Sequence, residues 1–136
     1  MAGVGRDSAG MNWLAVLAGG ALGSALRYAV GRAWLAPTSL TFPWGTVFVN
    51  VTGSMALGFL ARYFAPPAGS HALFLFLTVG LCGGYTTFST FTLDAFALVE
   101  RGAAVRAGAY VGASVVGSYV AMVAGYAAAR ALRPLP

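Results

Sequence analysis

The residues best suited to chemistry lie in one stretch of an otherwise apolar segment, Gly80 to Phe96, with the sequence GLCGGYTTFSTFTLDAF. It combines a glycine pair with four threonines and a serine, and it places Phe88 and Phe91 three residues apart. On a helix that spacing puts both rings on one face, where packing is their commonest use. A phenyl ring also has a positive edge, so rings presented edge-on can attract an anion weakly. Both uses stay open, and Thr90 adds a hydroxyl on a neighbouring face.

Hydrogen-bonding side chains also occur inside two other apolar segments. Asn50 lies near the middle of one, where its amide is costly unless it bonds a neighbouring helix or a permeant species. Tyr110, Ser114 and Ser118 recur every four residues in another, which lines one side of a helix with hydroxyls. A single serine in a membrane helix often bonds only its own backbone. The stripe together with Asn50 and the threonines indicates a polar path with no charged residue at its centre.

Two ionisable residues, Arg27 and Asp94, fall inside apolar segments, toward the same end of the predicted bundle. We expect them to line one water-filled vestibule, near enough to interact, with Arg27 drawing anions inward. The alternative is that Arg27 extends to the membrane interface and that water solvates Asp94 at a helix end. The sequence leaves both interpretations open.

The composition assigns these residues to a membrane protein, because 59% of the 136 residues are hydrophobic and 8% are charged. Crossing a bilayer takes about 20 helical residues, and four segments are long enough: about 12–34, 45–63, 72–99 and 107–129. We therefore predict an all-α integral membrane protein, multi-pass in the lipid of the cell (inner) membrane, with one domain over 12–133. Residues 1–11 form a polar leader that we expect to be disordered, and Met11 is an alternative start.

The third segment, 72–99, is too long for one straight span and carries the Gly83-Gly84 pair near its middle. We predict two half-helices, 72–82 and 86–99, joined by an unwound turn at the glycines. Unwound backbone at membrane depth needs protein or a polar cavity around it, because each unpaired amide costs several kcal/mol. Half-helix ends can also bind ions through their carbonyls and amides. A plain glycine kink is the alternative, but the hydroxyls of GGYTT favour an ion site.

The charges give no preferred orientation in the membrane. All eight basic residues are arginines, and four predicted spans divide them equally between the two faces. Such a balance suits a protein that inserts in both orientations and pairs antiparallel with itself, which would also help four helices to enclose a polar path. One His, one Cys and three acidic residues offer no nucleophile and base pair and no metal cluster, so we predict a protein that is not an enzyme. No polybasic surface for nucleic acid is present in the sequence.

Three blocks of the sequence resemble the signature blocks of the small bacterial fluoride channels, the Fluc or CrcB family. They are GGALGSALRY at 19–28, GTVFVNVTGSMALG at 45–58 and GLCGGYTTFSTF at 80–91. The resemblance implies an antiparallel, dual-topology homodimer with two fluoride pores and a structural sodium ion at its centre. It also implies passive, fluoride-selective efflux, which lowers cytoplasmic fluoride and confers resistance to its toxicity.

The resemblance assigns roles to individual residues. Phe88 and Phe91 match the pore phenylalanines of the family, and Asn50 matches the pore asparagine. Gly83 and Thr86 match the residues whose backbone carbonyls bind sodium, two oxygens from each subunit. The family's polar track on the last helix matches Tyr110, Ser114 and Ser118.

A different class, the dual-topology four-helix exporter of small molecules, shares the size and the charge balance. Proton coupling in such an exporter needs a membrane-embedded carboxylate near the middle of the first span, and residues 12–34 contain no acidic residue. The exporter is therefore the alternative rather than the preferred interpretation.

Overall fold

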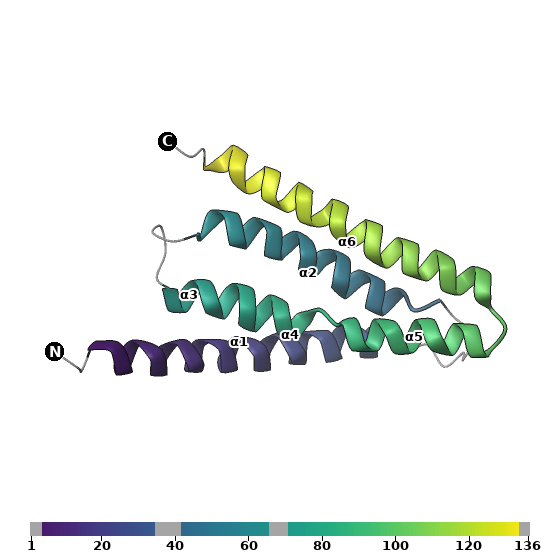
Figure 1. Cartoon of the computed structure of the whole chain (residues 1–136), viewed down its shortest axis with the longest axis horizontal. Coiled ribbons are helices and arrows are strands. Elements are labelled where there is room, and N and C mark those ends of the chain that lie inside the picture. The colour runs from purple at the N-terminus through teal and green to yellow at the C-terminus, as the bar shows by residue number, and fades with distance from the viewer. Residues whose placement is uncertain (1–3, 35–41, 66–70, 134–136) are drawn as a thin grey trace.

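The computed structural model describes residues 4–34, 42–65 and 71–133, and in those ranges it is all-helical. Helices α1 (Val4–Trp34) and α2 (Trp44–Tyr63), a broken third span and α6 (Ala104–Leu132) run alternately back and forth (Figure 1). Each is long and apolar enough to cross a membrane, which confirms, for the part of the chain that the structure describes, the four predicted spans. Helix α1 begins and α6 ends at the same end of the bundle (Figure 1).

Helix α1 begins earlier than the sequence predicted. Residues 4–11 are its first two turns rather than a disordered leader, and residues 1–3 lie outside the described residues. Starting a helix is costly, but extending one fixes only one further residue for each new hydrogen bond. A polar segment without proline can therefore continue a helix that the apolar residues have started. At about 1.5 Å per residue the helix is longer than a hydrocarbon core of about 30 Å requires, so it extends beyond the apolar layer.

The third span is broken, but not at the glycine pair. It consists of α3 (His71–Leu75), the π-helical segment η1 (Phe76–Cys82), α4 (Gly83–Tyr85) and α5 (Phe88–Glu100). The backbone leaves the helix at Thr86 (φ −81°, ψ 161°) and Thr87 (φ −151°, ψ 120°). Gly83 is helical (φ −63°, ψ −38°), so the predicted break at Gly83-Gly84 is wrong by about one turn.

The physical reason lies in what each residue type does here. Threonine is β-branched and favours extended backbone. The glycine lets two backbones approach, because a Cβ on Gly84 would lie 2.6 Å from the carbonyl oxygen of Gly20 on α1. A Cβ on Gly23 of α1 would likewise overlap the carbonyl of Leu81. The glycines of these two spans thus serve helix packing, as small residues do in membranes.

The other close pair is α2 with α6, which lie side by side in Figure 1. A Cβ on Gly58 would overlap the main chain of Met122, and one on Gly125 would overlap the main chain of Met55. Near the opposite end a small core joins α2, α5 and α6, made of Val47, Phe91, Leu98, Ala107 and Tyr110. Few residues of any span are buried, so most of the apolar surface faces outward, where lipid or a second copy would cover it.

Candidate functional site

Asn50 of α2 holds the broken backbone. Its Nδ2 donates to the carbonyl of Thr87 (3.1 Å), and the N–H of Thr87 donates to its Oδ1 (2.8 Å). One side chain therefore bonds both main-chain groups of Thr87, whose N–H has no helical acceptor once the helix is broken. Of the two partners that the sequence allowed, a neighbouring helix or a permeant species, the structure shows a bond to the neighbouring third span. The second N–H of the Asn50 amide is not needed for this bridge.

Thr87 also caps α5. Its Oγ1 accepts from the N–H of Thr90 (3.2 Å) and donates to Thr90 Oγ1 (3.1 Å), which is the N-cap arrangement. On the other side of the break, the N–H and Oγ1 of Thr86 both donate to the carbonyl of Cys82 (3.0 Å each). The hydroxyls of the two threonines in GGYTT thus stabilise the break, which lies about one turn after the predicted position.

These bonds redirect the N–H groups that two carbonyls would use in a continuous helix. The Gly83 carbonyl would accept from the N–H of Thr87, and the Thr86 carbonyl from the N–H of Thr90. The first N–H goes to Asn50 and the second to the side chain of Thr87. Both carbonyls lose their helical donors. Gly83 and Thr86 are the residues that the resemblance assigned to sodium, and carbonyl oxygens of this kind suit a hard cation.

The two phenylalanines begin α5 directly after the break. Their ring centroids are 5.5 Å apart with an interplanar angle of 43°. Phe91 is buried and lies 5.4 Å from the ring of Tyr110, whereas Phe88 is 76% exposed. Packing within the chain explains Phe91 but leaves Phe88 without a comparable role.

An open groove of about 340 Å³ lies beside the break, between α2, α5 and α6. We call it the serine groove, and its polar and aromatic lining consists of Asn50, Ser54, Thr86, Thr87, Phe88, Phe91, Ser114 and Ser118. The Oγ atoms of Ser114 and Ser118 are buried, yet neither has a hydrogen-bond partner among the described residues. Buried hydroxyls are normally paired, so two unpaired hydroxyls beside one groove indicate a partner that the described chain does not provide.

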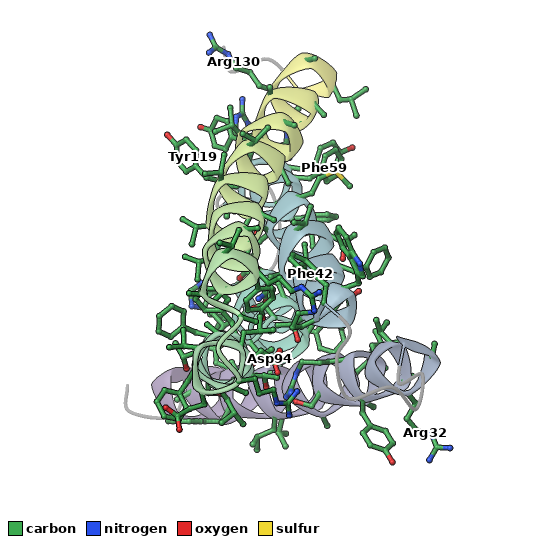
Figure 2. All side chains as sticks on the ribbon, turned by 90° about the vertical axis from the view of Figure 1, so that its right-hand side faces the viewer. Arg32, Phe42, Phe59, Asp94, Tyr119 and Arg130 are labelled. Atoms are coloured by element: carbon green, nitrogen blue, oxygen red, sulfur yellow. The ribbon has the colours of Figure 1, made fainter. Side chains whose placement is uncertain are left out.

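Tyr110, the third residue of the predicted stripe, has a different contact. Its fully buried side chain donates to Asp94 Oδ2 (3.2 Å), which also accepts from Thr46 Oγ1 (2.7 Å). Asp94 lies among the helices rather than at the outer surface, near Phe42 (Figure 2). The Phe42 ring meets the ring of Tyr110 edge-on, with centroids 5.7 Å apart. Asp94 and Tyr110 thus form a bonded cluster next to Phe91.

Arg27 lines a second cavity of about 360 Å³, which we call the vestibule cavity; Arg32, Thr46, Thr87 and Thr90 also line it. Arg27 Nε donates to the carbonyl of Gly84 (3.1 Å), and Arg27 forms no ion pair with Asp94 among the described contacts. Thr46 connects them indirectly, because it lines the cavity and bonds Asp94. The vestibule cavity and the serine groove share Thr87, which places the break between two polar spaces.

The sequence analysis did not identify three residues of this arrangement. They are Ser54, which lines the serine groove, Thr46, which bonds Asp94, and Thr87, which caps α5. Ser54 follows Asn50 by four residues, so the helical period could have placed both on one face. The bond from Thr46 to Asp94 joins residues 48 positions apart and has no local signal.

A family model described as CrcB-like protein, Camphor Resistance (CrcB), matches residues 14–126 of the chain. The chain belongs to the CrcB family.

Relatives in the CrcB family carry informative names. The chain is 52% identical to "Fluoride-specific ion channel FluC 1" of Nitrobacter hamburgensis, an alignment that covers 90% of this chain and all of that one. It is 54% identical to "Fluoride-specific ion channel FluC" of Nitrobacter winogradskyi, over 85% of this chain and 94% of the relative. It is 52% identical to "Fluoride-specific ion channel FluC" of Rhizobium meliloti, over 88% of this chain and 96% of the relative. With its four spans, this CrcB-family chain is a multi-pass protein of the bacterial cell membrane.

Proposed function

We propose that the protein is a fluoride-specific ion channel that lets fluoride leave the cell passively, so that cytoplasmic fluoride falls and the cell resists its toxicity. Relatives at about half identity carry that name over nearly their whole length. The observation that carries the proposal is the serine groove, where the hydroxyls of Ser114 and Ser118 are buried and unbonded beside Asn50.

Fluoride is small and holds its water tightly, so a pore must offer close hydrogen-bond donors as the hydration shell is removed. Ser114 and Ser118 supply hydroxyl donors, and Asn50 retains one amide N–H after it has bonded Thr87. We assign to Phe88 and Phe91 the weaker attraction of ring edges for the anion. The groove contains no cationic side chain among its lining residues, which keeps binding weak enough for exit.

The vestibule cavity serves as the entrance in this proposal. Arg27 and Arg32 raise the local anion concentration there, and Thr90 and Thr87 lead toward the groove. Fluoride efflux needs no coupled reaction. A membrane potential of 100 mV provides a driving free energy of about 2.3 kcal/mol for each elementary charge that crosses the membrane.

We propose further that two copies pair antiparallel and that a structural sodium ion joins them through the carbonyls of Gly83 and Thr86. The loss of both helical donors at these carbonyls supports the ion site. The balanced arginines and the exposed ring of Phe88, which a second copy would cover, support the pairing.

A small-molecule exporter is the weaker alternative. Its proton coupling would need a carboxylate within the first span, and the apolar part of α1, Ala9–Ala33, has none. The relatives' names do not favour it.

Reconstituted liposomes loaded with fluoride or with chloride test the proposal, with release followed by ion-selective electrodes. We expect fluoride release well above that of protein-free liposomes, and little chloride release. Equal release of the two anions, or no fluoride release from folded protein, would remove the proposed function.

A further inference from the structure

A buried arginine that no described carboxylate contacts lies at the end of the bundle where α2 and α6 both terminate. Arg62, in the last turn of α2, is only 7% exposed. Its Nη2 donates to the carbonyl of Arg133 (2.8 Å), and Arg133 Nη1 donates in return to the carbonyl of Tyr63 (2.8 Å). The two arginines thus tie the carboxyl ends of two neighbouring helices together.

These contacts leave positive charge uncompensated. Among the residues whose side chains the structure describes, no carboxylate contacts Arg62 or Arg133, although each guanidinium has five N–H donors. Arg130, in the last turn of α6, adds a third positive charge and projects outward (Figure 2). The carboxyl ends of α2 and α6 offset about half a charge each. Roughly two positive charges remain, and a buried charge without a counterion is costly.

The depth of this cluster indicates the source of the anion. Arg62, Arg130 and Arg133 lie at the ends of two membrane-spanning helices, where lipid headgroups meet the protein. The Tyr63 ring lies 5.9 Å from the guanidinium of Arg133 and stacks on Phe59, the arrangement of an interfacial aromatic pair. The planar guanidinium of an arginine can bind two phosphate oxygens at once through two parallel N–H donors.

We propose that Arg62, Arg130 and Arg133 bind the headgroup phosphate of an anionic phospholipid, independently of fluoride transport. The lipid phosphate supplies a counterion that no described side chain provides at this end, and the acyl chains cover the apolar flank of α6.

Delipidated protein in detergent tests this without fluoride. The dissociation constant is measured from the rise in melting temperature during titration with phosphatidylglycerol, with phosphatidylcholine of the same acyl chains, and with inorganic phosphate. We expect a rise of several degrees with phosphatidylglycerol alone. Arg130→Gln removes about 1 kcal/mol of attraction, which weakens binding about fivefold, while Arg130→Lys retains most of it.

Arg32→Gln is the matched control, because it removes one exposed arginine at the opposite end of the bundle. Arg130 has no side-chain hydrogen bond in the described structure, so its variants should fold as the parent does. Equal stabilisation by phosphatidylcholine would overturn the proposal. So would an equal loss of affinity in Arg32→Gln, and stabilisation by inorganic phosphate alone would show that the ligand is a free oxyanion.

Discussion

Replacing Ser118 with alanine separates ion binding from folding, because its buried hydroxyl bonds nothing within the described chain. An unpaired buried hydroxyl carries a desolvation penalty of about 1–3 kcal/mol, so its removal should leave the melting temperature unchanged or higher. In the channel the same hydroxyl is proposed to donate to fluoride. A hydrogen bond to a charged group contributes about 1.5–3 kcal/mol, which corresponds to a loss of about 10- to 150-fold in flux when that position limits passage.

The assay is fluoride efflux from liposomes at known protein density, with the melting temperature measured on the same preparation. Ser118→Thr is the control, because it keeps a hydroxyl at the same position and should retain most of the flux. Ser114→Ala provides a second test of the same kind. If Ser118→Ala is folded and conducts as the parent does, the groove is not the fluoride path. A large fall in melting temperature would show that the hydroxyl has a structural partner instead.

Three further substitutions test other parts of the site. Asn50→Ala leaves the N–H of Thr87 unpaired, while the Thr87 carbonyl keeps its bond within α5, so we expect a loss of about 1–3 kcal/mol in a detergent unfolding titration; unchanged stability would contradict the proposed bridge. Ser54→Ala should lower fluoride flux severalfold at constant melting temperature, since Ser54 lines the groove; equal flux would place it outside the path. Phe91→Leu should reduce fluoride flux in folded protein, and unchanged flux would assign this ring to packing.

The sequence predicted the spans well because span length and hydropathy are set by the bilayer rather than by contacts. The break was misplaced for a different reason. Gly83-Gly84 was interpreted as a helix breaker, but a glycine in a membrane helix also allows close packing, and the space that Gly84 leaves is taken by Gly20 of another span. Sequence pattern alone does not distinguish a glycine that bends a helix from one that makes room for its neighbour.

The sequence could identify candidate site residues where the period of one helix places them on the same face. Ser114 and Ser118 fall in one groove because four residues make about one turn. Contacts across the chain were not recoverable. Asn50 with Thr87, and Arg27 with Gly84, join residues 37 and 57 positions apart, and their geometry depends on how the spans cross. Arg27 bonds the carbonyl of Gly84 and Asp94 accepts from Thr46, and the expected interaction of Arg27 with Asp94 stays a prediction.

The break explains how a chain with few charges could form both of the sites proposed above, one for a cation and one for an anion. Asn50 and the Thr87 side chain take the two N–H groups that Gly83 and Thr86 would otherwise use, so carbonyl oxygens are freed on the backbone. The same bonds fix the start of α5, and with it the positions of Phe88 and Phe91 beside the serine groove. In the proposed channel, sodium would interact with carbonyl dipoles and fluoride with hydroxyl, amide and ring-edge dipoles. Since one set of hydrogen bonds creates both, a change at Asn50 should weaken the cation site and the anion path together, whereas Ser118→Ala should affect the anion path alone.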